Sequence, residues 1–123
     1  MNLRYLKNRY YLEEVRKIKK YTKKEIENFI EKKPISIIYF SGESCNVCPI
    51  IKNKLKIILE NYKEVDIIEI DVSSNREISA SYNIFSTPVL LLFVEGKESL
   101  RYGRNIDFME FEKNLNRYYQ LVF

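Results

Sequence analysis

A buried strand followed at once by two closely spaced cysteines is the feature that most restricts this chain. Residues 35–40, Ile-Ser-Ile-Ile-Tyr-Phe, are apolar on both faces, which is typical of a strand in the interior of a sheet. A turn at 41–44 leads to Cys45-Asn46-Val47-Cys48, the only two cysteines of the chain. The next segment repeats apolar residues at helical spacing, at Ile50, Ile51, Leu55, Ile58 and Leu59. The pattern predicts a cysteine pair at the first turn of a helix.

Such a placement gives the two sulfurs different chemistry. Residues three apart on a helix lie on the same side, so the sulfurs of Cys45 and Cys48 can come within bonding distance. The helix dipole and the unpaired N–H groups at a helix start favour negative charge there. A thiol pKa lowered from about 8.5 to about 7 raises the thiolate at neutral pH from about 3% to about half. We expect Cys45, the more N-terminal and more exposed sulfur, to attack, and Cys48 to resolve.

The cysteine pair has two other interpretations. Zinc normally takes four Cys or His ligands, and with two cysteines and no histidine a site within one chain is disfavoured, although a metal shared between two chains stays open. The pair can also be two inert buried thiols, but the strand-to-helix junction favours a reactive thiol. Cysteines three residues apart close no long loop, so they form no structural framework and indicate a compartment in which thiols are reduced. We therefore expect a cytoplasmic protein.

Length and charge limit the other classes of function. A chain of 123 residues fits one domain with a sizeable core. Residues 1–33 hold eleven Lys or Arg against five Asp or Glu, whereas the rest holds ten against twelve, so the net charge of +4 comes from the N-terminal part. A basic tract at 16–24 could bind nucleic acid, but a solvated face is the simpler interpretation. The sequence contains no signal-peptide or membrane-span pattern. We expect a monomer that binds neither nucleic acid nor membrane.

The order of the predicted elements defines the fold class. Residues 1–14 are expected to form a short helical extension, and the domain at 15–123 is expected to begin with an edge strand at 15–21. Capping boxes at Thr22–Glu25 and Ser74–Glu77 begin helices that end near Glu31 and Tyr82. The remaining elements are strands at 65–72, 89–94 and 98–102, the last two in a hairpin, and a helix at 107–121. This order predicts an α/β domain with a mixed sheet covered by helices on both faces.

The same residues resemble the thioredoxin family over positions 15–121. The resemblance rests on Cys45-x-x-Cys48 after a central strand and on Thr87-Pro88 immediately before the next apolar strand. It implies the thioredoxin fold, a cis peptide bond at Pro88, and a backbone contact of Thr87 with an extended substrate segment, which would pair there like an added strand. These two residues are the predicted substrate-binding residues.

The chain departs from the family pattern at several positions. Ser44 replaces the usual Trp before the first cysteine, and Tyr39 stands where the family has a buried Asp that assists proton transfer. Ile67 replaces the Lys that accompanies that Asp, and Asn46-Val47 replaces Gly-Pro. Pro49 follows the second cysteine and removes one backbone N–H from the helix start.

These observations predict a thiol–disulfide oxidoreductase that needs no metal or organic cofactor. We expect it to reduce protein or small-molecule disulfides and to be recharged by a thiol reductase system. The alternatives are a non-catalytic thioredoxin-fold interaction module, in which the replaced Trp and Asp mark a loss of turnover, and a thiol redox sensor. Glu69 and Asp71, on one face at the end of a strand, are interpreted as solvated acids without a role.

Overall fold

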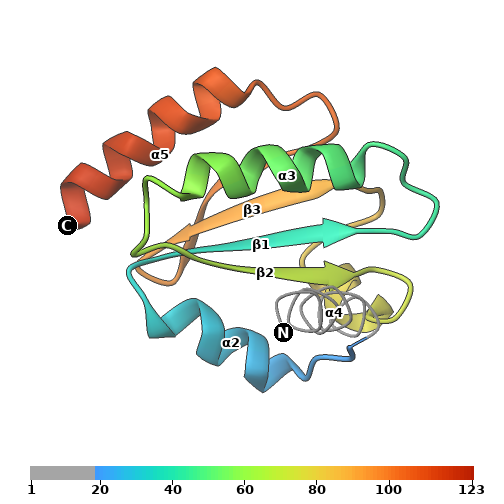
Figure 1. Ribbon diagram of the computed structural model, residues 1–123. Helices are drawn as coiled ribbons and strands as arrows, with labels where there is room; N and C mark the ends of the chain where they lie inside the picture. The colour runs from blue at the N-terminus through green and yellow to red at the C-terminus, as the bar shows by residue number, and fades with distance from the viewer. Residues whose placement is uncertain (1–18) are drawn as a thin grey trace, which may run out of the picture.

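The computed structural model describes residues 19–123, which form a four-stranded mixed sheet between two layers of helices (Figure 1). The predicted leading helix and most of the predicted first strand lie outside these residues. The elements are α2 (Lys23–Lys32), β1 (Ile35–Ser41), α3 (Cys48–Leu59), β2 (Asp66–Asp71), α4 (Arg76–Ser81), β3 (Val89–Val94), β4 (Lys97–Tyr102) and α5 (Phe108–Val122). The predicted α/β class is confirmed.

Strand β1 lies inside the sheet, as its apolar sequence predicts. The strand order is β2-β1-β3-β4, with β1 parallel to β2 and antiparallel to β3. All seven residues of β1 are buried. Because side chains alternate along a strand, Ile35, Ile37 and Tyr39 enter one core and Ile38 and Phe40 enter the other.

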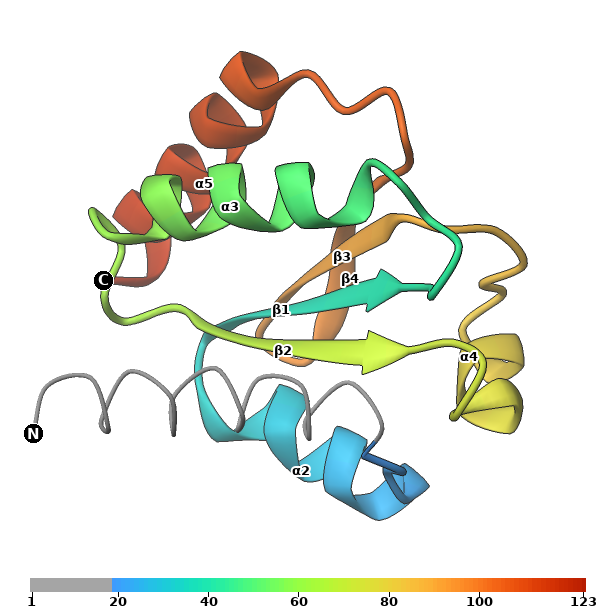
Figure 2. The same cartoon turned by 45° about the vertical axis from the view of Figure 1, so that its right-hand side comes forward.

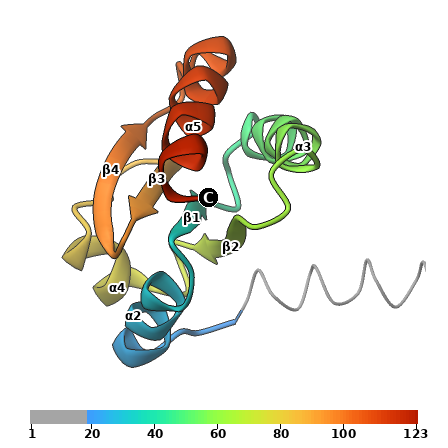
Figure 3. The same ribbon diagram turned by 90° about the vertical axis from the view of Figure 1, so that its left-hand side faces the viewer.

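Each face of the sheet carries its own helices. Helices α3 and α5 cover one face, and α2 and α4 cover the other, as Figures 1 and 3 show. The core under α3 and α5 contains both cysteines. The C-terminal end of β1 and the N-terminal end of α3 meet at one edge of this layer (Figure 2). No helix within residues 19–123 has the length and apolar character needed to span a membrane.

Local sequence signals account for several element boundaries. The capping box at α2 is present, because the Thr22 hydroxyl accepts from the Glu25 N–H at 3.1 Å and the Glu25 carboxylate accepts from the Thr22 N–H at 2.9 Å. The β3–β4 hairpin turns through Glu95 and Gly96, both with positive φ, and pairs antiparallel as predicted.

Two predictions are wrong for the described residues. The sequence predicted a capping box at Ser74–Glu77, and it predicted an edge strand that includes residues 19–21. Helix α4 begins at Arg76, with Asn75 as an N-cap residue whose side chain makes no capping bond. The Asn75 side chain instead accepts from the Tyr21 N–H at 2.7 Å and donates to the Lys19 carbonyl at 2.9 Å. These bonds hold the segment before α2 against the loop that leads into α4, so residues 19–21 form no part of the predicted edge strand.

Candidate active site

The Cys45–Cys48 disulfide lies where β1 ends and α3 begins. The two sulfurs form a disulfide bond, with the Cα atoms 5.5 Å apart. The predicted proximity of the two thiols is thereby confirmed. Within the described residues, no group of three or more Cys, Asp or Glu side chains is arranged to hold a metal ion.

The prediction that both cysteines lie in the first turn of the helix holds for Cys48 and is wrong for Cys45. Helix α3 begins at Cys48 with Val47 as its N-cap, so Cys45 lies in the turn ahead of the helix. The Cys45 N–H donates to the Gly42 carbonyl at 3.2 Å, and the Cys48 N–H donates to the Cys45 carbonyl at 3.3 Å. Pro49 has no N–H to offer. The helix start therefore stabilises a Cys45 thiolate less than a placement inside the first turn would.

Both cysteines are shielded from solvent. Cys45 is 7% exposed and Cys48 is 4% exposed, so Cys45 is the more exposed of the two, as expected, although both residues are buried in this disulfide form. The apolar stripe of α3 also differs from the prediction, since Ile51 and Leu55 are buried whereas Ile50 is 56% exposed. Burial of Cys48, Ile51 and Leu55 turns the helix so that Ile50 faces outward.

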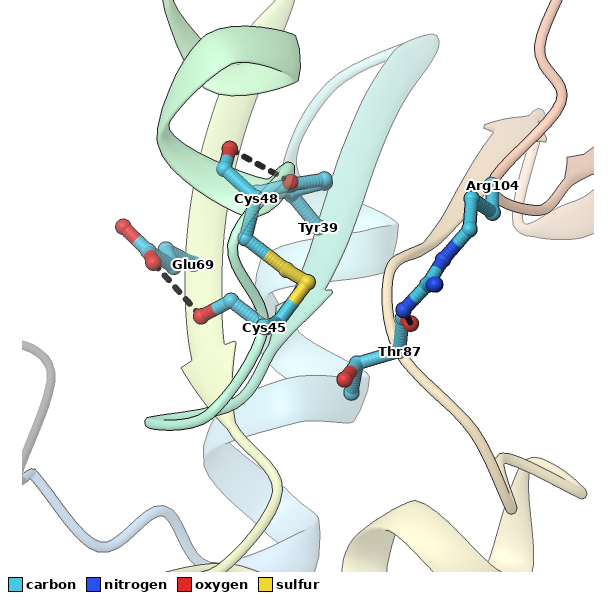
Figure 4. The surroundings of a disulfide bond; sticks show 7 residues. Tyr39, Cys45, Cys48, Glu69, Thr87 and Arg104 are labelled. Carbon is cyan, nitrogen blue, oxygen red and sulfur yellow. Dashed lines mark hydrogen bonds between the residues drawn. A yellow bond between two sulfur atoms is a disulfide. The ribbon is translucent and has the colours of Figure 1, made fainter.

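Tyr39 lies directly beneath the disulfide. Its side chain is 1% exposed, and its hydroxyl donates to the Cys48 carbonyl at 2.8 Å (Figure 4). Burial raises the pKa of the Tyr39 phenol, and the nearby Glu69 carboxylate raises this pKa further. The phenol therefore stays protonated and ties the first turn of α3 to the centre of the sheet.

The raised pKa of Tyr39 predicts that the protein becomes less stable at alkaline pH. An unfolded tyrosine loses its proton near pH 10, but folded Tyr39 keeps its proton to higher pH, so the free energy of unfolding falls as pH rises above 10. The contribution of one such group is about 1.4 kcal/mol per pH unit. We expect Tyr39→Phe to lose about 1 kcal/mol at pH 7 with the hydrogen bond and to show a shallower decline above pH 10. Urea unfolding from pH 7 to 11 measures both effects.

The other tyrosines provide an internal control for this experiment. Tyr62 and Tyr82 also have a raised pKa, with burial as the largest cause, and both remain in the Tyr39→Phe variant. The difference between wild type and variant therefore isolates Tyr39. Parallel curves of unfolding free energy against pH would contradict the assignment.

Glu69 is held in a polar contact rather than solvated, which corrects the sequence interpretation. It is the cross-strand partner of Tyr39 and is 13% exposed. Its carboxylate accepts from the Ser41 hydroxyl at 2.6 Å and pairs with the Lys52 ammonium at 2.8 Å. Asp71 is also buried and accepts from the Ser73 hydroxyl at 2.6 Å. The Lys52–Glu69 pair joins α3 to β2 beside the disulfide.

The Thr87-Pro88 segment lies across from the disulfide. The peptide bond between these residues is cis, as the family resemblance implies. Thr87 approaches the loop before Cys45 closely, because a Cβ placed on Gly42 would lie 3.0 Å from the Thr87 hydroxyl oxygen. A side chain at position 42 would therefore require the Thr87 side chain to shift by a few tenths of an ångström. This close approach brings together the two segments that sequence analysis singled out, about forty residues apart in the chain.

Arg104 is a residue of the site that the sequence analysis missed. It lies in the loop between β4 and α5, and its guanidinium donates to the Thr87 carbonyl at 3.3 Å (Figure 4). Its only local signal is a position shortly after the last strand, which does not distinguish it from an ordinary loop arginine.

Comparison with known proteins shows which family shares this arrangement of a Cys-x-x-Cys pair and a cis-proline segment. The family model for thioredoxin matches residues 17–117. The chain belongs to the thioredoxin family. It is 36% identical over 96 residues to the thioredoxin-like protein YdfQ of Bacillus subtilis, an alignment that covers 78% of this chain and 86% of that protein. Thioredoxin-family proteins with a Cys-x-x-Cys pair are generally thiol–disulfide oxidoreductases, which act on disulfides and are recharged by reductase systems.

Solved structures support the same assignment. A thioredoxin-like protein from Bacillus cereus is 30% identical, with a TM-score of 0.61, covering 76% of this chain and 98% of that one. The oxidized form of mitochondrial thioredoxin 3 from Saccharomyces cerevisiae has a TM-score of 0.69 at 21% identity, with coverage of 80% and 92%, and shows the shared fold alone. This chain therefore has the thioredoxin fold.

Proposed function

We propose that this thioredoxin-family protein reduces protein or small-molecule disulfides through the Cys45–Cys48 dithiol. The observation that carries the proposal is the position of the cysteine pair, at the end of β1 and across from Thr87-Pro88. A substrate bound along Thr87 would bring its own sulfur towards Cys45. We assign the roles of attacking and resolving thiol to Cys45 and Cys48, respectively.

The reaction consists of two thiol–disulfide exchanges. The Cys45 thiolate attacks one sulfur of the substrate disulfide, a mixed disulfide forms, and the first substrate sulfur leaves as a thiolate. Cys48 then loses its proton and attacks the Cys45 sulfur, which releases the second substrate thiolate and closes the Cys45–Cys48 disulfide. Two electrons and two protons pass from the dithiol to the substrate. A dithiol reductant must then reopen the disulfide before the next cycle.

Substrate binding is assigned to the backbone of Thr87 next to Pro88. Thr87 is half-buried and Pro88 is buried, and they immediately precede strand β3. An extended peptide can pair with such a segment through main-chain hydrogen bonds, which are independent of the substrate sequence. We further propose that the protein works as a cytoplasmic monomer, because a compartment with reduced thiols keeps the dithiol available.

A turnover assay tests the proposal. We expect the reduced protein to accelerate the reduction of insulin-type disulfides by an external dithiol, and Cys45→Ser to lower the rate to that of the dithiol alone. The serine hydroxyl has the size of the thiol but is not ionised at neutral pH and cannot exchange with a disulfide. If wild type and Cys45→Ser are equally inactive on every protein and small-molecule disulfide tested, the protein is not a reductase.

The shielding of the sulfurs favours a second candidate, a non-catalytic interaction module. Cys45 is only 7% exposed, and Ser44 beside it offers no aromatic surface for docking. Alkylation of the reduced protein by iodoacetamide separates the two candidates. A reductase requires that Cys45 react at least as fast as an unfolded-peptide thiol at pH 7, whereas an interaction module with inert thiols reacts far more slowly.

A further inference from the structure

Arg104 lies beside the proposed substrate-pairing segment and has no carboxylate partner among residues 19–123. Its side chain is exposed, and one of its nitrogens donates to the Thr87 carbonyl at 3.3 Å. Over residues 19–123, no acidic side chain lies within ion-pair distance of it. Asp107, three residues further on, is engaged at the start of α5, where it accepts from the Met109 and Glu110 N–H groups. Arg104 thus carries a positive charge that no described acidic residue neutralises by direct contact.

The position of this charge relates it to the substrate path. Figure 4 shows Arg104 and Thr87 together across from the disulfide, with the end of the Arg104 side chain at the Thr87 carbonyl. A peptide that pairs with the Thr87 backbone would therefore lie next to the guanidinium, which is bonded to the same residue. A guanidinium offers five N–H donors in a planar fork, which matches the two oxygens of a carboxylate. The bond to Thr87 uses one of the two terminal nitrogens and leaves donors for a ligand.

We propose that Arg104 selects disulfide substrates that carry an Asp or Glu next to the reacting cysteine, by binding that carboxylate. This inference rests on the proposed function, because it assigns the substrate segment to Thr87. The bidentate pair would form on the rim of the site, where water and salt screen it in part. Arg104 would then determine specificity without taking part in the exchange of sulfur bonds.

Peptides that differ by one isosteric residue test the proposal. We compare kcat/KM for two peptide disulfides that place Asp or Asn beside the cysteine. We expect wild type to prefer Asp by about fivefold, the upper range for an exposed ion pair. The preference should disappear in Arg104→Gln and shrink at high salt. Lys97→Gln removes the same charge at the β3–β4 turn and should keep the preference.

A binding experiment separates this inference from the proposed function. Peptides with Ser in place of Cys are titrated into the protein while the Arg104 Nε–H resonance is followed by NMR. Stronger binding of the Asp peptide than of the Asn peptide, lost in Arg104→Gln, supports the inference even if no disulfide is turned over. Turnover with equal kcat/KM for both peptides overturns the inference and leaves the reductase intact. A preference that survives in Arg104→Gln also overturns it.

Discussion

The Cys48→Ser variant is expected to accumulate a covalent mixed disulfide between Cys45 and its substrate. In wild type the Cys48 thiol lies on the first residue of α3, next to the sulfur it must attack, with the two Cα atoms 5.5 Å apart. Tyr39 holds the Cys48 backbone in this position through the bond to its carbonyl. A well-oriented neighbouring group can reach an effective concentration of about 10⁵–10⁸ M. A serine cannot displace the substrate sulfur, so the adduct persists.

The size of this effect follows from the lost intramolecular step. Only external thiol, at millimolar concentration, can release the substrate from Cys48→Ser, so we expect turnover to fall by more than about a hundredfold. Mass spectrometry without reducing agent measures the adduct, and the insulin assay measures turnover. Cys45→Ser is the matched control and should form little adduct. An adduct that forms on Cys45→Ser and not on Cys48→Ser would reverse the assigned roles of the two thiols.

Replacement of the buried Phe111 by alanine is expected to lower the free energy of unfolding strongly. Phe111, on α5, is fully buried in the same core as both cysteines. Its ring packs edge-on against Tyr102 of β4, with the centroids 5.7 Å apart and the planes at 85°. Phe111→Ala removes this buried surface and leaves a cavity between α5 and the sheet, which costs about 3–5 kcal/mol. A domain of this kind has a total stability of about 5–15 kcal/mol.

Denaturant unfolding measures this loss, and the same helix provides the control. Leu121 also lies on α5 but is 75% exposed, so Leu121→Ala should change the free energy of unfolding by no more than about 0.5 kcal/mol. A loss below about 1 kcal/mol for Phe111→Ala would show that α5 does not depend on this contact.

Local sequence patterns determined most of the fold. The apolar run of β1, the capping box of α2 and the β3–β4 hairpin depend on residues close together in the chain, and each was predicted from the sequence. The cysteine pair was predictable for the same reason, because a spacing of three brings the sulfurs together within one turn. The cis bond before Pro88 followed only from the family resemblance.

The tertiary structure alone decided the details that shape the site. The burial of Cys45, the contact of Tyr39 with the Cys48 carbonyl, the Lys52–Glu69 pair and the approach of Arg104 to Thr87 join different elements of the fold. Sequence periodicity shows which face of an element is apolar, but not which polar group meets it from another element. Such contacts depend on the relative positions of helices and strands, and these positions are set only when the whole core packs.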